Sequence, residues 1–342
     1  MARTIFLLSL FIATAFILNA QTKIIALHHN GNPTYYTDLD SAYYYALPGD
    51  TMYLPGGDFF PTGSGGTWVI SKRIHVLGAG YRADSSAATG PTRIIGKLIF
   101  ATGSDSASAQ GFQVTAAIDI NADLKGILLS RMAISEYLFI GNNAHGNIIK
   151  ECLIFAIPYP YDCMNLSSSY GNNFYNCVFS GNIADGGTAN SFENCVLNSG
   201  EFAYGYYCSF KNCIFISAVN NTYQTSYTTL DHCIMPGTGL LGNFPNLQGT
   251  VTNATIANVL TSYSDPVIIN NNYNLKVPPP GNINPAIGGG NLGQDCGIYD
   301  GLFPFKDNRH PSHPRITFKD IAPYTDANGD LQVEVKTEAQ KN

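Results

Sequence analysis

Three stretches of eight residues decide the fold: NFYNCVFS at 173–180, SFENCVLN at 191–198 and SFKNCIFI at 209–216. In each stretch a cysteine follows an asparagine, with an apolar residue three positions before the cysteine and another two positions after it. The segments IIKECLIF (148–155) and TLDHCIMP (229–236) keep the same frame around their cysteine. The cysteines lie 25, 18, 18 and 20 residues apart and are Cys152, Cys177, Cys195, Cys213 and Cys233. A repeat of about twenty residues with a fixed apolar frame is typical of a solenoid.

The parity of the apolar positions indicates which solenoid the chain forms. In a strand, residues two apart share a face, so the cysteine and the apolar residue after it point the same way. The apolar residue three positions earlier has the opposite parity and reaches the same core only if the chain bends. Asn176, Asn194 and Asn212 stand at that bend, and asparagine tolerates the left-handed backbone that a one-residue corner needs. The sequence therefore predicts an all-β coil of strand, asparagine corner and strand around a narrow apolar core.

The flanks of the repeats predict caps and a change of structure near the C-terminus. Residues 39–46 have helical spacing, and a short helix there would cover the open end of the first coil. Residues 274–275, 284–288 and 295–299 are interpreted as two last, irregular coils. Residues 303–342 are predicted to form a linker and a two-stranded hairpin, which turns at Asn328-Gly329 and packs on the last coil.

The first twenty residues predict export. One cation, Arg3, precedes the apolar run of residues 5–18, which is too short to span a bilayer and is typical of a signal peptide cut after Ala20. We therefore divide the chain into a signal peptide (1–20), a β-helix domain (21–302) and a C-terminal extension (303–342). The mature chain is expected to be secreted or held at the cell surface, with no transmembrane segment after cleavage.

Charge argues against a nucleic-acid partner. Lysine and arginine number 18 against 24 aspartate and glutamate, for a formal charge of -6, and only 12% of residues are charged. Nucleic-acid binding usually needs clustered cations.

The chain resembles a known family, the exported right-handed parallel β-helix proteins of the pectin lyase-like superfamily. The resemblance covers roughly residues 25 to 302. It rests on ALPGDT at 46–51, the repeated Phe-x-Asn-Cys-x-Phe rungs, and NPAIG at 284–288 followed by CGIY at 296–299. It implies a single-stranded right-handed parallel β-helix. It leaves the chemistry open, because the superfamily includes lyases, polygalacturonases, tailspikes and adhesins.

Two enzymatic hypotheses, a polysaccharide lyase and a glycoside hydrolase, have candidate residues in the sequence. A polysaccharide lyase needs a cationic base, for which Arg131 and Lys150 on neighbouring rungs are the candidates, although solvated surface positions explain them more simply. A glycoside hydrolase needs paired carboxylates, and the candidates are Asp162, Asp185 and Glu201. Their offsets from the preceding cysteine drift, which weakens the hydrolase hypothesis.

The cysteines are expected to be core thiols. Their spacing lacks the close pairs of zinc ligands, so we expect no metal site and no cofactor, and stacked reduced thiols in the core. Cys163 and Cys208 fall outside the frame, in loops, and a disulfide between them is left open.

Loop aromatics favour binding over catalysis. Aromatic faces stack on sugar rings with little desolvation penalty. The sequence predicts a non-catalytic structural, adhesive or glycan-binding scaffold, with a polysaccharide or cell-surface glycan as partner and a polysaccharide-degrading enzyme as the alternative. The candidate ligand-binding residues are Tyr159, Tyr161, Asp162, Tyr204, Tyr206 and Tyr207.

Overall fold

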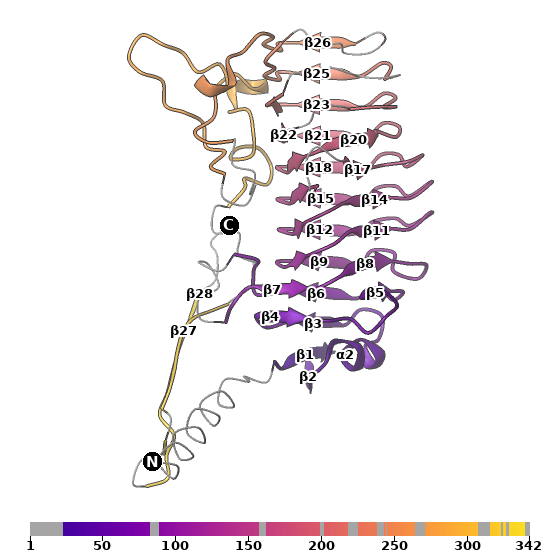
Figure 1. Ribbon diagram of the computed structural model, residues 1–342, viewed down its shortest axis with the longest axis vertical. Coiled ribbons are helices and arrows are strands. Elements are labelled where there is room, and N and C mark those ends of the chain that lie inside the picture. The colour runs from indigo at the N-terminus through magenta and orange to yellow at the C-terminus, as the bar shows by residue number, and fades with distance from the viewer. Residues whose placement is uncertain are drawn as a thin grey trace, which may run out of the picture.

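The chain folds into three long sheets of stacked strands, a parallel β-helix (Figure 1). The structure is a computed structural model that describes residues 23–82, 89–156, 162–198, 202–217, 225–237, 243, 245–263, 271–306, 315–322, 324–325 and 328–338. The segment assigned to the signal peptide lies outside these residues. The six coils from β3 to β20 each contribute one short strand to each sheet, and the next coil pairs with it in parallel.

Three groups of strands make the sheets. Sheet 1 has twelve strands, in the order β2 (Asn32–Tyr36), β1 (Ile25–His29), β3 (Thr51–Tyr53), β6 (His75–Leu77), β9 (Ser108–Gln110), β12 (Leu128–Ser130), β15 (Ile148–Lys150), β18 (Asn173–Tyr175), β21 (Ser191–Glu193), β23 (Ser209–Lys211), β25 (Thr229–Asp231) and β26 (Asn246–Gln248). Sheet 2 has eight, which are β4 (Gly57–Phe59), β7 (Thr92–Ile94), β10 (Gln113–Val114), β13 (Ala133–Ile134), β16 (Leu153–Phe155), β19 (Val178–Ser180), β22 (Val196–Asn198) and β24 (Ile214–Phe215). Sheet 3 has six, which are β5 (Thr67–Ile70), β8 (Lys97–Phe100), β11 (Ile118–Ile120), β14 (Leu138–Ile140), β17 (Asp162–Asn165) and β20 (Asn182–Asp185).

The corner between sheets 1 and 2 has the predicted backbone. Asn176, Asn194 and Asn212 have φ of 52°, 53° and 54°, in the left-handed region. Arg131 and His232 adopt the same conformation at the same place in their coils. In each coil the left-handed residue at this corner reverses the side-chain parity, so that the strands on both sides of the corner face one core.

The core is a stack of aromatic rings and thiols. Phe174, Phe192 and Phe210 stack face to face, with ring centroids 4.7 Å apart at each step. The five repeat cysteines are buried and free, as expected. Cys163 and Cys208 are also buried free thiols, so the disulfide left open by the sequence does not form in the structure.

A buried column of amides runs beside the core, and the sequence reasoning missed it. Asn147, Asn172 and Asn190 each precede a strand of sheet 1 and are fully buried. The Asn147 side-chain amide donates to Asn172 Oδ1 at 2.9 Å, and that of Asn172 donates to Asn190 Oδ1 at 3.0 Å. Cys208 occupies the equivalent place in the next coil, where its thiol lies 3.3 Å from the Gly186 carbonyl. The column gives buried polar groups their partners, as burial requires.

The N-terminal end is capped as predicted. Helix α2 (Leu39–Tyr45) begins at Asp38, whose carboxylate accepts from the Ser41 amide at 2.7 Å. Leu39 and Ala42 are buried in the same hydrophobic cluster as the first coils. The antiparallel strands β1 and β2 extend this end of sheet 1, so β3 is paired on both sides and the short, exposed β2 is the terminal strand.

Residues 284–305 do not form the two last coils that the sequence predicted. They run back along the side of the stack, beside the corner between sheets 1 and 2 (Figure 1). We call residues 284–305 the strap. Its buried residues Ala286, Cys296, Ile298 and Phe305 join a second apolar cluster with the outward-facing side chains of sheet 2. Two short 3-10 turns, Ile256–Asn258 and Asn291–Gly293, lie in this C-terminal region.

The C-terminal hairpin forms, with a different register and environment from those expected. Strands β27 (Arg315–Ile321) and β28 (Val333–Glu338) pair antiparallel, joined by residues 322–332 rather than by a tight turn at Asn328-Gly329. All six residues of β28 are exposed, so the hairpin does not pack on the last coil as the sequence suggested.

Candidate functional site

The edge between sheets 3 and 1 carries exposed aromatic side chains in register. Bridges between successive coils align one residue per coil there, four positions before the buried apolar residue of the sheet 1 strand. The column consists of Lys125, His145, Tyr170, Thr188, Tyr206, Ser226 and Asn243. Tyr207 and Tyr227 directly follow the column residues Tyr206 and Ser226, and both have a left-handed backbone. We call His145, Tyr170, Tyr206, Tyr207 and Tyr227 the aromatic edge.

Two stacked pairs form within the aromatic edge. His145 and Tyr170 have ring centroids 4.8 Å apart and nearly parallel planes, at 3°. Tyr207 and Tyr227 repeat the arrangement at 5.0 Å and 8°. The tyrosines remain open to solvent, with Tyr207 61% and Tyr227 48% exposed. Each pair therefore presents aromatic surface along the axis of the solenoid.

Tyr207 and Tyr227 stand at a corner where three other coils use glycine and one uses Ala189, whose φ is 52°. Their φ values are 55° and 58°, and the equivalent residues Gly126, Gly146 and Gly171 have φ of 70°, 62° and 60°. A bulky side chain in this conformation costs about 1–2 kcal/mol relative to an ordinary backbone. Strained positions occupied by large residues often indicate function.

The structure brings only part of the sequence-predicted site to this edge. Tyr206 and Tyr207 belong to it, and Tyr204 lies in the turn just before it, 40% exposed. Asp162 is the first residue of β17 in sheet 3. Tyr159 and Tyr161 lie outside the described residues.

Three members of the aromatic edge were missed: His145, Tyr170 and Tyr227. The signal was present, because each stands three or four residues before the apolar residue that opens its repeat. Equal offsets in successive coils stack on one another in a parallel solenoid. Counting backwards from the repeat frame would therefore have found all three.

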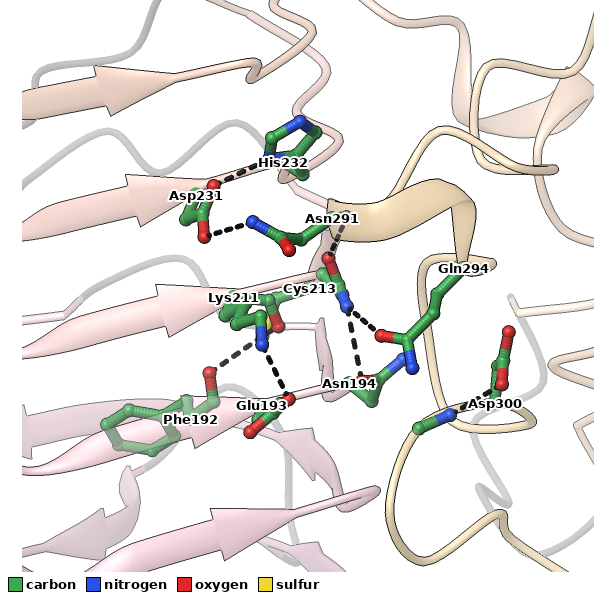
Figure 2. A network of polar contacts seen from close by, with 12 residues as sticks. Phe192, Glu193, Asn194, Lys211, Cys213, Asp231, His232, Asn291, Gln294 and Asp300 are labelled. Carbon is green, nitrogen blue, oxygen red and sulfur yellow. Dashed lines mark hydrogen bonds and ion pairs between the residues drawn. The ribbon is translucent and has the colours of Figure 1, made fainter.

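The opposite edge of sheet 1 carries a polar network that holds the strap (Figure 2). Asn212 Oδ1 accepts from the Asn291 amide at 2.7 Å, and its Nδ2 donates to Gln294 at 3.0 Å. The side-chain amide of Asn194 donates to the carbonyls of Asp295 and Gly297 at 3.1 and 3.0 Å. The corner asparagines thus serve twice, once in the backbone corner and once in fixing the strap.

A carboxylate and an imidazole meet in the same network. Asp231 Oδ1 lies 2.5 Å from His232 Nδ1, and Asp231 Oδ2 accepts from Asn291 Nδ2 at 3.0 Å. On the neighbouring coils Lys211 pairs with Glu193 at 3.1 Å. With both oxygens of Asp231 engaged, the pair ties sheet 1 to the strap.

The lyase candidates have other partners. The sequence suggested that Arg131 is a solvated surface residue, and this was wrong. Its side chain is only 10% exposed, and its Nε lies 2.6 Å from Glu151 Oε2. Lys150 Nζ lies over the Phe303 ring, 4.0 Å from its centroid. A guanidinium held in a buried ion pair is a poor base, so these contacts argue against proton abstraction by Arg131.

The hydrolase candidates do not form a facing pair. Asp162 pairs in register with Asn182, and Asp185 with Asn165, so the two carboxylates lie at opposite ends of neighbouring strands. Burial raises the pKa of Asp185, and a hydrogen bond from the Gly187 amide at 2.9 Å opposes the rise. Glu201 lies outside the described residues.

Comparison with known proteins finds no matching family model, no similar curated protein and no similar solved structure. None of the described helices is long and apolar enough to cross a membrane. Among the described residues, no group of three or more His, Cys, Asp and Glu side chains is placed to hold a metal ion. The aromatic edge is therefore the candidate site, on geometry alone.

Proposed function

We propose that this chain is an exported, non-catalytic β-helix protein of the pectin lyase-like superfamily that binds polysaccharide or cell-surface glycan along the aromatic edge. The stacked sheets and the Phe-x-Asn-Cys-x-Phe rungs support the superfamily assignment. The apolar run of residues 5–18 supports export.

The observation that carries the binding proposal is the pair Tyr207 and Tyr227 at left-handed corners. Stacking between the two rings contributes about 0.5–1.5 kcal/mol, which is less than the combined strain of two left-handed backbones at about 1–2 kcal/mol each. A glycine pair would serve the fold equally well. The gain from tyrosine is therefore an exposed aromatic surface, and sugar rings bind such surfaces through their apolar faces.

The spacing of the rings suits an extended chain of sugars. Successive coils lie about 4.8 Å apart, so Tyr170 and Tyr206, two coils apart in one column, are separated by about 10 Å. Thr188 stands between them and offers a hydroxyl. A glycan lying parallel to the solenoid axis would contact both aromatic pairs.

The double variant Tyr207→Gly/Tyr227→Gly tests this proposal. Because glycine relieves the left-handed strain, we expect the melting temperature to stay within about 3 °C of the parent. A shift of that size corresponds to a change of about 1 kcal/mol or less in the free energy of unfolding. Binding on a glycan array, or in pull-down with insoluble polysaccharide, should be lost.

The matched control is Tyr35→Ala, which removes a tyrosine that is 67% exposed in β2, away from the aromatic edge. It should leave binding unchanged. Retention of glycan binding by the folded double glycine variant would discard the proposal.

A further inference from the structure

A cavity of about 400 Å³ lies between the strap and the outer face of sheet 1. One wall comes from coils at and beside the corner, and the other from residues 302–306. The side chains that matter chemically are Arg131, Lys150, Glu151, Phe303 and Lys306. The cavity is at the corner with sheet 2, across sheet 1 from the aromatic edge, so it is a separate site.

The charge in this cavity is opposite to that of the molecule. Three cationic side chains and one carboxylate line it, in a chain whose formal charge is -6. Arg131 and Glu151 neutralise each other in their buried ion pair. Lys150 and Lys306 remain, and neither lies in an ion pair within the described part of the chain. Two lysines that line one half-open cavity repel each other, and an anion bound between them would relieve that repulsion.

The wall formed by the strap is fixed in place. The Asn176 side-chain amide donates to the carbonyls of Ile298 and Asp300, at 2.8 and 2.6 Å. Tyr175 contacts Phe303 edge to face, with ring centroids 5.3 Å apart. Lys150 Nζ over the same ring completes the wall. A preorganised wall loses little entropy when a ligand binds.

We propose that this cavity binds a small polyhydroxylated ligand bearing one anionic group, a carboxylate or a phosphate. Lys150 and Lys306 neutralise the anion, while Ser130 on the cavity wall presents a hydroxyl. The volume falls at the lower end of the range for small-molecule sites, about 300–1,000 Å³. The site is independent of glycan binding at the aromatic edge.

Isothermal titration of the full chain tests the site with three six-carbon probes. Gluconate carries a carboxylate, glucose 6-phosphate carries a phosphate, and glucose carries no charge. We expect at least one of the anionic probes to bind one to one and glucose not to bind, with affinity falling as salt rises. The anionic probe that binds identifies which of the two groups the cavity prefers.

Two variants locate the binding. Lys150→Gln and Lys306→Gln should each weaken it by about tenfold, the size expected for loss of one charge-assisted contact. Lys125→Gln removes an exposed lysine on the other edge of sheet 1 and should have no effect. Thermal melts verify that each variant is folded.

The proposal is overturned if neither anion binds, if glucose binds as well as they do, or if folded Lys150→Gln and Lys306→Gln both bind like the parent. Glycan-array binding by Lys150→Gln should be unchanged, which separates this result from the outcome at the aromatic edge.

Discussion

Single residues in this chain interact with both the coil above and the coil below. Asn172 shows this most fully, because its amide donates to Asn190 Oδ1 and its own Oδ1 accepts from the backbone and side-chain nitrogens of Asn147. Buried and bonded on both sides, it needs both a donor and an acceptor at one position. Only an amide side chain of this length supplies both.

Asn172→Asp is predicted to destabilise the protein by about 3 kcal/mol or more, since it removes a donor and buries an uncompensated charge against Asn190 Oδ1. Urea denaturation at pH 7 measures the loss. Asn173→Asp is the control, because Asn173 is the next residue and is partly exposed. Equal stabilities for the two variants would contradict the account of the amide column.

The structural positions of individual residues could be predicted where the sequence repeats a pattern of apolar and polar residues. The repeat frame located the thiols and the corners at Asn176, Asn194 and Asn212. It gave no sign that Arg131 is buried, because cations usually lie at the surface. Glu151 nevertheless occupies the same frame position one coil later, so stacking of equal positions could have predicted the ion pair.

Among the elements, the prediction of two last coils at residues 284–299 was wrong, because these residues form the strap. Its short motifs resemble rungs, yet within the described part of residues 249–306 no strand joins the three sheets. The residue just after each repeat cysteine gave the missing evidence. It is apolar every time and has outward parity, as in Val178, Val196 and Ile214. A sheet with apolar side chains on both faces must be covered on both, and the strap and the residues before it provide that cover.

Shortening the chain is predicted to separate the roles of strap and hairpin. A chain ending at residue 283 exposes outward side chains of sheet 2, each worth about 1.5–3 kcal/mol when fully buried. We expect it to bind the dye ANS and to melt at a lower temperature. A chain ending at residue 306 keeps the strap, lacks β27 and the exposed strand β28, and should match the parent in both assays.

Similar dye binding by the chains ending at 283 and at 306 would contradict the covering role of the strap. It would mean that Ala286, Ile298 and Phe305 do not shield sheet 2 in solution.

At the scale of the whole molecule, the apolar interior is divided into two parallel columns. One runs inside the coils, and the other lies between sheet 2 and the C-terminal segment. Sheet 2 is therefore buried on both faces from β13 to β24, whereas the outer face of sheet 1 stays open enough to form part of a cavity. The aromatic edge and the cavity lie on opposite sides of that sheet.

Buried thiols lie in both columns, seven in the inner column from Cys152 onward and Cys296 in the outer one, and this predicts how stability changes with pH. Burial raises the pKa of Cys177 and Cys213, raises that of Cys208 to about 11 and raises that of Cys296 to about 12. In the unfolded chain a thiol ionises at a pKa of about 8.5. The unfolded state therefore loses protons first, so the contribution of these thiols is complete below that pH and is lost as pH rises toward 11.

We expect the urea midpoint to be constant from pH 7 to 8 and to fall steadily from pH 8.5 to 10, below the range in which lysine titrates, at about 10.4. Cys208→Ala and Cys296→Ala should each make this fall shallower, because each removes one proton-linked group. Native thiols should resist a thiol reagent across the same range and all react after unfolding. A midpoint that does not change with pH, or a slope unaltered in both variants, would show that the thiols are not buried as the two columns require.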